Sequence, residues 1–393
     1  MRGHHRPRAV VAALAACAFA LLPATPARAD GIRVQQWGLE ALHTTEAWRT
    51  TKGGGVTVAV LDTGVDATHP DLVGNVLPGK DLVGFGAKSG DRAWARHGTA
   101  MAGIVAGHGH GTDGEDGVLG IAPEAKILPV RVILEGTDPA RNKARNTRGT
   151  ALAEGIRWAV DHGADVINLS LGDDSESAHA DAGEDAAVQY ALSKGAVVVA
   201  SAGNGGEKGD HISYPAAYPG VIAVTAVDRF GTHAAFSTSR WYATVNAPGV
   251  DIVIADPDRK YYQGWGTSAA SAFVSGAVAL VRSAHPGLTP AQIKKLLSDT
   301  AGERPGGDGH DDDKGYGTVD PVAAIEAGAK LRPADVKAST SGYRARYFGS
   351  GPVAAPQDDG PMSLFAPVAG GIGVLLLAAA AVLWRGGRPT APR

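Results

Sequence analysis

The sequence predicts an α/β fold in which a mostly parallel central sheet is covered by helices on both faces. Short runs of apolar, strand-forming residues alternate with helical stretches along much of the chain, as is typical of such a sheet. Residues 56–61 are almost continuously apolar, as expected for a strand that is buried on both faces. The chain has 393 residues, of which 44% are hydrophobic, so it can bury a substantial core.

The expected elements follow in order from residue 30. Residues 30–50 form a short leader, in which residues 42–49 suit a short helix, and three glycines at 53–55 then break the chain. Residues 100–106, which are mostly small, are expected to be helical. The later strands are expected at residues 127–132, 166–171, 197–200 and 221–227, and the later helices at residues 149–162, 182–194 and 269–285.

Ser268 stands between a glycine-rich turn and a predicted helix. Glycine at positions 264 and 266 tolerates the tight backbone bend that such a turn requires. Residues 269–285 combine good helix formers with apolar positions at helical spacing. Ser268 is therefore expected at a helix N-terminus, where free N–H groups and the helix dipole stabilise developing negative charge. Two interpretations follow, a catalytic nucleophile and a simple helix cap.

Three other polar residues occupy positions at which sites are commonly built. Asp62 comes directly after the strand at residues 56–61, and open α/β sheets place their sites at the carboxyl ends of strands. His97 precedes a predicted helix. Asn204 lies in a glycine-rich loop after the strand at residues 197–200, where its amide could donate to an oxyanion. Taken singly, these residues are equally consistent with turn formers and a structural histidine.

Two polar insertions interrupt the pattern. Residues 136–148 are basic and residues 302–314 are acidic, and each is expected to be a solvated loop. The acidic insertion also admits a calcium site, although its spacing matches no recognised calcium loop. The charged residues are Arg141, Lys143, Arg145 and Arg148 in the first insertion, and Asp308, Asp311, Asp312 and Asp313 in the second.

Both ends of the chain carry membrane signals. Residues 1–29 combine a basic start, an apolar run and an Ala-Arg-Ala cleavage site, as a signal peptide does. Residues 332–364 have the composition of a flexible linker. Residues 365–384 form an uncharged apolar run of the length of a membrane-spanning helix, and residues 385–393 add three arginines. The positive-inside rule then places this tail in the cytoplasm and the domain at residues 56–331 outside the plasma membrane.

Composition narrows the classes of partner and cofactor. The net charge is −3 and the sequence has no nucleic-acid-binding pattern, so nucleic acid is disfavoured as a partner. The only cysteine, Cys17, lies in the signal segment, so the exported protein is expected to have no disulfide. The residues before Cys17 also resemble a lipoprotein box, but those after it stay apolar. Nothing in the sequence requires a metal or another cofactor.

The residues Asp62, His97 and Ser268 occur in the chain order of the subtilisin triad. Their local sequences resemble the three signatures of subtilisin-like serine proteases, and the resemblance covers about residues 37–330. It implies a subtilisin-like three-layer fold and hydrolysis of peptide bonds through an acyl-enzyme. The matching segments are Val60-Leu61-Asp62-Thr63-Gly64-Val65, His97-Gly98-Thr99-Ala100-Met101-Ala102-Gly103 and Gly266-Thr267-Ser268-Ala269-Ala270.

The resemblance also implies a role for each residue. Ser268 would attack the scissile carbonyl, His97 would transfer the proton, and Asp62 would orient the imidazole. The side chain of Asn204 and the backbone N–H of Ser268 would hold the oxyanion. The family pattern further implies a substrate-binding strand at Ser170, Leu171 and Gly172, a wall of the specificity pocket at Ala202 and Gly203, and its base near residues 214–216.

The order of the segments resembles that of the mycosins, which are membrane-anchored subtilases of actinobacterial type VII secretion systems. The shared features are a signal peptide, an N-terminal extension at residues 30–55, a catalytic domain, a linker and one C-terminal helix. This resemblance implies protein or peptide substrates and secretion components as partners. It leaves two functions open, an endopeptidase for exported proteins and a mainly structural subunit of a secretion complex. The family's proline four residues after the nucleophile is here Ala272, which is expected to alter rigidity but not chemistry.

Overall fold

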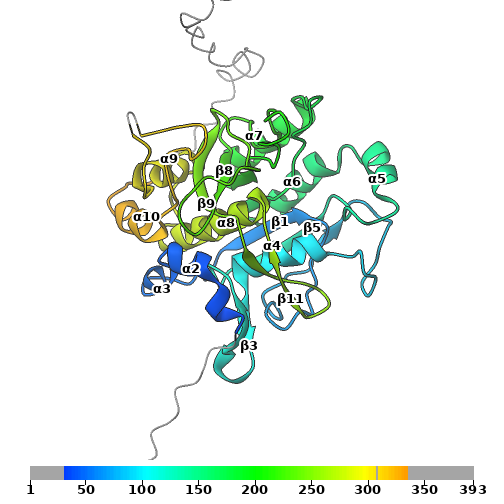
Figure 1. The fold of residues 1–393 in the computed structure, drawn as a ribbon, viewed down its shortest axis with the longest axis horizontal. Coiled ribbons are helices and arrows are strands. Elements are labelled where there is room, and N and C mark those ends of the chain that lie inside the picture. The colour runs from blue at the N-terminus through cyan, green and yellow to red at the C-terminus, as the bar shows by residue number, and fades with distance from the viewer. Residues whose placement is uncertain (1–30, 307–308, 335–393) are drawn as a thin grey trace, which may run out of the picture. The chain divides into compact units, whose positions relative to one another are not determined.

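A seven-stranded sheet forms the centre of the protein (Figure 1), whose computed structural model describes residues 31–306 and 309–334. Every neighbouring pair of strands is parallel. The strands, in order across the sheet, are β2 (Lys80–Asp81), β5 (Lys126–Arg131), β1 (Thr57–Asp62), β6 (Val166–Leu169), β7 (Val197–Ser201), β8 (Ile222–Val227) and β9 (Ala243–Pro248).

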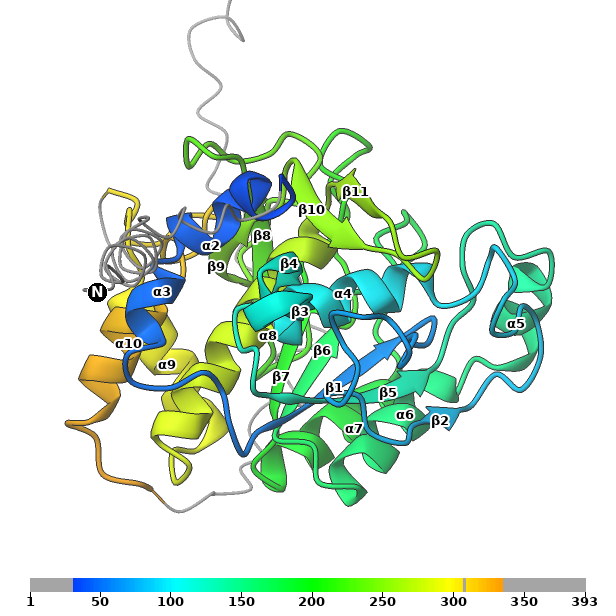
Figure 2. The same cartoon turned by 90° about the horizontal axis from the view of Figure 1, so that it is seen from below.

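Helices cover both faces of this sheet (Figure 2). Two of them pack against each other over one face, and two others pack side by side over the opposite face. The three-layer α/β arrangement expected from the alternation of strands and helices is therefore confirmed. The first pair is α4 (Arg96–Ala106) and α8 (Thr267–Ala284), and the second pair is α6 (Ala151–Asp161) and α7 (Ala182–Ser193).

The alternation of side chains along β1 explains the unbroken apolar run of its sequence. Successive side chains of a strand point to opposite faces of the sheet. Val58 and Val60 join the core cluster that contains most of α8. Leu61 faces α6, where a Cβ added to Gly155 would lie 3.4 Å from Leu61 Cδ2. Both faces of β1 are covered, which explains the apolar residues from Val58 to Leu61.

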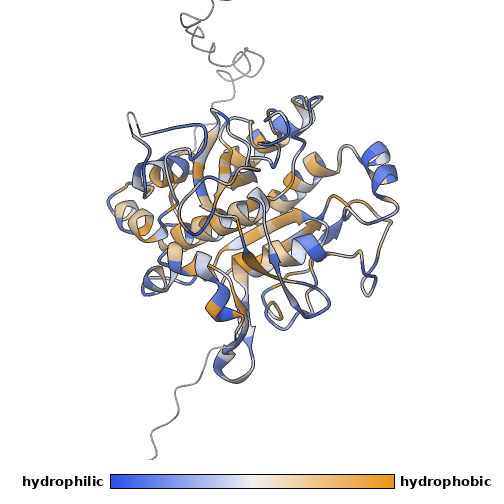
Figure 3. Cartoon of the chain, in the orientation of Figure 1, coloured by the Kyte–Doolittle hydropathy of each residue, from blue (hydrophilic) through white to orange (hydrophobic). Residues whose placement is uncertain are grey.

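Helix α8 lies in the middle of the domain and is buried over most of its length. Figure 3 shows that it belongs to the apolar interior, whereas polar residues concentrate in the peripheral helices and loops. Its small side chains allow a close approach to neighbouring segments. A Cβ at Gly276 would lie 1.6 Å from Ile121 Cγ2, so only glycine fits at that contact.

Smaller elements surround this framework. The leader forms a short 3-10 helix and two short α-helices, and two hairpins extend from the domain. These elements are η1 (Arg33–Gln35), α2 (Trp37–Ala41), α3 (Thr44–Ala47), the hairpin β3 (His108–His110) and β4 (Asp116–Leu119) with η2 (Thr112–Gly114) between them, α5 (Arg141–Thr147), the hairpin β10 (Ile252–Ala255) and β11 (Tyr261–Gly264), α9 (Pro290–Thr300) and α10 (Pro321–Gly328).

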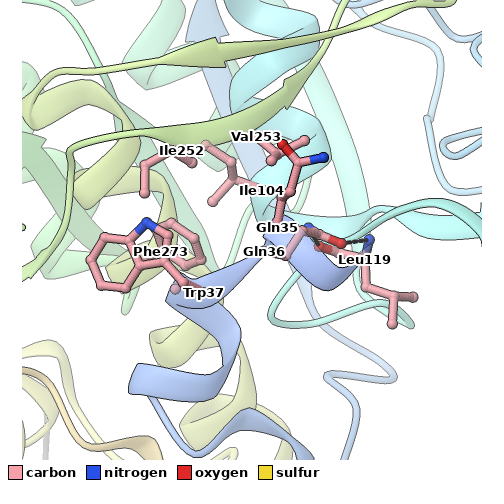
Figure 4. A pocket seen from close by; sticks show the side chains of 9 residues that line it. Gln35, Gln36, Trp37, Ile104, Leu119, Ile252, Val253 and Phe273 are labelled. Carbon is pink, nitrogen blue, oxygen red and sulfur yellow. Dashed lines mark hydrogen bonds between the residues drawn. The ribbon is translucent and has the colours of Figure 1, made fainter. Parts of the chain in front are cut away.

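The leader is packed onto the domain and encloses a small pocket with it (Figure 4). Gln36 pairs with the backbone of Leu119 through both ends of its amide, at 2.7 and 3.0 Å. The indole of Trp37 donates to Val250 O at 3.2 Å. None of the candidate site residues lines the pocket, which lies between the leader and the core residues Ile104, Ile252, Val253 and Phe273.

The expected strands and helices of the core agree with the structure to within a few residues, and the differences lie at the periphery. The single helix expected at residues 42–49 is replaced by α2 and α3, which His43 separates in a left-handed conformation. The basic insertion at residues 136–148 contains helix α5, so the expectation of a loop was wrong there. Strand β9, both hairpins, α9 and α10 were not among the expected elements.

The expected terminal segments lie outside the described residues. They are the signal peptide at 1–29, most of the linker at 332–364, the apolar run at 365–384 and the tail at 385–393. Among residues 31–306 and 309–334, no helix has the length and apolar character needed to cross a membrane.

Candidate active site

Asp62 and His97 form a hydrogen-bonded pair at the carboxyl end of β1. Asp62 is the last residue of that strand and is fully buried. The Nδ1 atom of His97 lies 2.9 Å from Asp62 Oδ1 and 2.8 Å from Oδ2. The backbone N–H of Thr63 donates to Asp62 Oδ1 at 2.7 Å and holds the carboxylate in place. With Nδ1 engaged by the carboxylate, Nε2 is the ring nitrogen available for exchanging a proton with a substrate or nucleophile.

The first turn of α4 is pressed against the end of β1. His97 is the second residue of that helix. Its backbone N–H donates to Glu135 Oε1 at 2.8 Å, and the next N–H, of Gly98, donates to Thr63 Oγ1 at 3.1 Å. A Cβ at Gly98 would lie 2.0 Å from Gly64 O, so the family-like His-Gly sequence is required sterically. The role of Glu135 was not predicted, because a single acidic residue after a strand is too common to indicate a function.

The surroundings of His97 favour its charged form. Burial of the imidazole acts to lower the pKa of His97, but the charge of Asp62 and its hydrogen bond together outweigh that effect. The charge of Glu135 acts in the same direction as Asp62, so the pKa of His97 lies above its ordinary value. A histidine in this setting is stabilised after it takes up a proton, as a general base must be.

Ser268 lies at the start of α8, as the sequence predicts, but the N-cap of the helix is Gly266, so Ser268 is not the helix cap. It is the second residue of the helix and follows Gly266, whose φ of 140° favours glycine. The Ser268 hydroxyl donates to the backbone carbonyl of Ser170 at 3.2 Å, and the Ser170 hydroxyl donates to Ser268 O at 2.9 Å. Ser268 is thus fixed to the chain that leaves the end of β6.

The register of the sheet brings Ser170 and Asp62 to the same edge. Strands β1 and β6 are neighbours, and Val60 pairs with Asn168. Continuing this register past the end of β6 sets Ser170 opposite Asp62, and neighbouring strands lie about 5 Å apart. The segment that anchors Ser268 and the carboxylate that orients His97 therefore leave adjacent strands.

A buried amide links β6 to the second and third turns of α8. Asn168 is fully buried, and its Oδ1 accepts hydrogen bonds from Ser275 Oγ at 2.9 Å and from Ser271 Oγ at 3.2 Å. Its Nδ2 donates to Ser170 Oγ at 2.9 Å. One side chain thus positions two helix turns and the serine that holds Ser268. This role was not predicted from the sequence, because a polar residue in an apolar strand does not reveal which groups it contacts.

Asn204 lies beside the start of α8 with its amide in a defined orientation. Its Oδ1 accepts hydrogen bonds from the backbone N–H and the hydroxyl of Thr267, both at 3.0 Å. This leaves Nδ2 as the group of the amide that can donate to a ligand. Asn204 Nδ2 and Ser268 N each lie 3.7 Å from the point that a Cβ of Gly266 would occupy. The two donors predicted for an oxyanion therefore flank the same glycine.

The residues expected to bind substrate line the space between the ends of β6 and β7. Ser170 is buried, Leu171 is half-buried and Gly172 is exposed. Close packing requires the glycines, because a Cβ at Gly172 would lie 2.9 Å from Ser213 Oγ and one at Gly203 would lie 3.1 Å from Ser213 Cβ. The hydroxyl of Ser213 is buried and has no hydrogen-bond partner within residues 31–306 and 309–334, and it was not among the expected site residues. The buried Ala202 completes this wall.

The acidic insertion does not form a recognisable metal centre in the part of the chain that the structure describes. Across residues 31–306 and 309–334, no group of three or more histidine or acidic side chains could hold a metal ion. Asp311 accepts the backbone N–H of Lys314 at 2.6 Å, and Asp313 lies near His233 at 3.8 Å and accepts the Ser239 hydroxyl. These contacts give the insertion a structural role. Asp308 lies outside the described residues.

Comparisons with known proteins agree with this geometry. A family model described as the subtilase family matches residues 53–317. Thermitase from Thermoactinomyces vulgaris is 37% identical over 267 residues, which make up 68% of this chain and 88% of thermitase. Fervidolysin from Fervidobacterium pennivorans is 39% identical over 321 residues, or 74% of this chain, but the match spans only 43% of fervidolysin.

Solved structures give the same result. The crystal structure of fervidolysin matches with a TM-score of 0.63 and 36% identity, covering 74% of this chain and 45% of that one. The crystal structure of MycP1 from Mycobacterium smegmatis matches with a TM-score of 0.63 and 31% identity, covering 79% of this chain and 88% of that one. The expected three-layer fold and the resemblance to subtilisins and mycosins are confirmed.

Proposed function

Because the chain belongs to the subtilase family, we propose that it is a serine endopeptidase with Asp62, His97 and Ser268 as its triad. The observation that carries this proposal is the hydrogen bond of 2.8 Å between His97 and Asp62. Asp62 ends β1, and the neighbouring strand β6 leads to Ser170, which holds Ser268. A buried carboxylate, an imidazole and a serine at a helix start are the groups that acyl transfer requires.

The mechanism follows from these positions. The Ser268 hydroxyl, which donates to Ser170 O in the structure, turns toward Nε2 of His97 when a substrate carbonyl approaches. His97 takes the hydroxyl proton as Oγ attacks the carbonyl carbon, and then gives that proton to the leaving amine. Asp62 stabilises the imidazolium throughout, and the raised pKa of His97 is consistent with this role. Water then attacks the carbonyl carbon of the acyl-enzyme through the same steps, with His97 again as the base, and the Ser268 hydroxyl is released.

The oxyanion of each tetrahedral intermediate would be held by two donors. Asn204 Nδ2 would be one donor, because the oxygen of the same amide already accepts two hydrogen bonds from Thr267. The backbone N–H of Ser268 is the second donor, since it lies in the first turn of α8 and has no intrahelical acceptor. Helix α8 adds the positive end of its dipole.

The substrate would lie in extended form across the carboxyl ends of the strands. Ser170, Leu171 and Gly172 would pair with its backbone, and Ala202 and Gly203 would line the pocket for the residue before the cleaved bond. Gly172 and Gly203 both pack closely against Ser213, which supports a wall of the pocket built from small residues at this position. The class of substrate is an accessible, extended segment of a protein or peptide.

We further propose that the protein acts at the plasma membrane in type VII secretion. The uncharged apolar run at residues 365–384, with arginines after it, supports one membrane span with the catalytic domain outside. The similarity to MycP1, a serine protease described as an essential component of the type VII (ESX-1) secretion system, supports the secretion role. The exported proteins handled by such a system are then the expected substrates.

Hydrolysis of an unfolded protein, such as reduced casein, by the full-length chain in detergent tests the endopeptidase proposal. Wild type should cleave, and Ser268→Ala should lose the activity while keeping its unfolding midpoint. Equal hydrolysis by both proteins would refute the assigned nucleophile.

A mainly structural role in a secretion complex is the second candidate. The description of MycP1 as an essential component favours it, because essentiality need not require catalysis. Complementation of a strain that lacks the gene separates the two roles. If Ser268→Ala restores secretion and removal of residues 365–393 does not, the structural role predominates. If Ser268→Ala fails to restore secretion, catalysis is required.

A further inference from the structure

We propose that a basic lobe next to His97 selects substrates that carry an acidic side chain a few residues from the cleaved bond. The basic lobe consists of residues 83–92 and 134–148, which include the insertion that the sequence predicts to be a solvated loop. This inference rests on the proposed endopeptidase function and specifies its substrate class.

The basic lobe is an ordered structure with its own small core. Val83, Leu134 and Ala144 form a buried cluster, against which Phe85 and Ala140 pack. Helix α5 is therefore anchored through its single buried residue, Ala144, while its other side chains are available to solvent. An anchored helix presents its charges at fixed positions, so it can discriminate between ligands at a lower entropic cost than a mobile loop.

Each acidic side chain of the basic lobe accepts hydrogen bonds from backbone N–H groups. Asp91 accepts from Lys88 N at 2.8 Å, and Glu135 accepts from His97 N at 2.8 Å. Asp138 accepts from Ala87 N at 2.7 Å and from Ala140 N at 2.8 Å. These carboxylates serve to build the lobe and its contact with α4, and the lobe still carries more cationic than acidic side chains.

The cationic side chains of the basic lobe outnumber these carboxylates and lack acidic partners. Across residues 31–306 and 309–334, none of them forms an ion pair with a carboxylate. Lys143 and Arg145 are exposed, and the Lys143 ammonium lies 4.5 Å from the centroid of the Phe85 ring. An incoming carboxylate could therefore form an ion pair with either side chain without breaking an existing one. The six cationic residues are Lys88, Arg92, Arg141, Lys143, Arg145 and Arg148.

The position of the basic lobe ties this charge to the active site. Glu135 contacts the backbone of His97 directly, and Arg141 at the start of α5 is hydrogen-bonded to the carbonyl of Leu134, the residue before Glu135. The charge of Arg141 also acts on the pKa of His97, in the lowering direction. The lobe lies on the far side of β1 from β6 and β7, and so from Asn204, because β5 neighbours β1 on that side.

The length of α5 sets the reach of the selection. Its seven residues span about 10 Å at 1.5 Å per residue. An extended peptide advances about 3.3 Å per residue. The charges of α5 could therefore meet a substrate carboxylate over a span of about three peptide positions, a few residues from the cleaved bond on the His97 side.

An anionic membrane surface is the other partner that a cationic patch could serve. The hydrogen bond between Glu135 of the basic lobe and the backbone of His97 favours a peptide as the partner. It places the lobe next to the site at which a substrate must bind. A charge on this path raises the local concentration of acidic segments and lowers that of basic ones.

The test uses the full-length protein in neutral detergent and internally quenched peptides on a neutral, alanine-rich frame. One Asp, Lys or Ala residue is moved along the frame, and kcat/KM is measured for each peptide. The variant Lys143→Gln/Arg145→Gln removes two exposed charges and keeps good helix formers. The control Lys52→Gln/Lys330→Gln removes two other exposed lysines, Lys52 before β1 and Lys330 after α10.

For wild type and the control, we expect Asp to be preferred over Ala by about fivefold at one position a few residues from the bond, at low salt. The preference should vanish in Lys143→Gln/Arg145→Gln and at high salt, while cleavage of the all-Ala peptide changes by less than about twofold. Cleavage without any Asp preference, or a preference that survives the double substitution, would refute this inference alone. A total lack of cleavage would refute the proposed function as well.

Anionic phosphatidylserine vesicles provide the remaining arm. If the double substitution abolishes vesicle binding and leaves peptide selectivity unchanged, the basic lobe serves a membrane and the inference is overturned. If vesicle binding is equal for both proteins and peptide selectivity changes, the inference stands.

Discussion

Replacement of Asn168 by alanine should destabilise the protein and disturb the nucleophile at the same time. Asn168 is fully buried between β6 and α8. Its Oδ1 accepts hydrogen bonds from Ser271 and Ser275 at 3.2 and 2.9 Å, and its Nδ2 donates to Ser170 at 2.9 Å. Ser170 in turn donates to Ser268 O at 2.9 Å. The substitution therefore removes the group on which these contacts converge.

The magnitude follows from the hydroxyl groups that are left without partners. Alanine leaves the donors of Ser271 and Ser275 in a buried space, and a buried unsatisfied polar group costs about 1–3 kcal/mol. Both serines lie within the helix and can turn to the carbonyl one turn earlier, which recovers part of that cost. We expect Asn168→Ala to lower the free energy of unfolding by about 3 kcal/mol and Ser275→Ala to lower it by about 1 kcal/mol.

Urea unfolding of the two single variants and the double variant measures both values and their coupling. Once Ser275 is alanine, Asn168→Ala leaves one fewer unpaired donor, so the double variant should lose about 1 kcal/mol less than the sum. The kcat of Asn168→Ala should also fall, because Ser170, which holds Ser268, loses a supporting hydrogen bond. A loss below about 1 kcal/mol for Asn168→Ala, or strict additivity, would refute this account of the buried amide.

Three further predictions concern the oxyanion, the pH profile and the helix contact. Asn204→Ala should lower kcat by about 10²- to 10³-fold with little change in KM, because Nδ2 acts on charge that develops in the transition state. Activity should fall with decreasing pH as His97 is protonated, with a midpoint above its ordinary pKa of about 6.5. Glu135→Gln should shift that midpoint to lower pH, because a negative charge that stabilises the imidazolium is removed. Gly276→Ala should cost about 1–3 kcal/mol of stability, since its Cβ would lie 1.6 Å from Ile121 Cγ2.

Each of these predictions has a result that contradicts it. An Asn204→Ala variant that changes KM alone would assign the amide to ground-state binding. A midpoint that stays in place or moves to higher pH in Glu135→Gln would remove Glu135 from the electrostatics of His97. Unchanged urea unfolding of Gly276→Ala would mean that α8 can shift away from Ile121 at no cost, and Gly155→Ala provides a comparison at the other face of the sheet.

The central sheet could be predicted from the sequence because its strands are buried on both faces. Burial favours β-branched and apolar residues at most positions of β1, β6, β7 and β8, and such runs are recognisable without knowledge of neighbours. The elements at the periphery gave weaker patterns. In β11, the strand Tyr261–Gly264 is only partly covered and contains glutamine. The start of helix α9 could have been predicted from its sequence. Thr289 and Gln292 form a capping box, and Pro290 occupies the first helical position.

The candidate site could be predicted in part for a similar reason. Asp62, His97 and Ser268 lie where a strand ends or a helix begins, and such positions show in the local sequence. Glu135 acts on them from the segment after β5 and Asn168 from β6, both distant in sequence, so their role depends on the fold. Helix α5 was not predicted, because six of its seven residues are polar and no apolar pattern marks it. Its stability comes from Ala144 and a few contacts with residues 83–85.

The most direct test of the central claim is covalent labelling of the full-length protein with a fluorophosphonate, followed by mass mapping of the labelled peptide. The reagent reacts with a serine that is activated by a neighbouring base and an oxyanion site. The account predicts that wild type is labelled on Ser268, that Ser268→Ala is not labelled, and that His97→Ala is labelled far more slowly. Labelling at another serine, or equal labelling rates of wild type and His97→Ala, would contradict it.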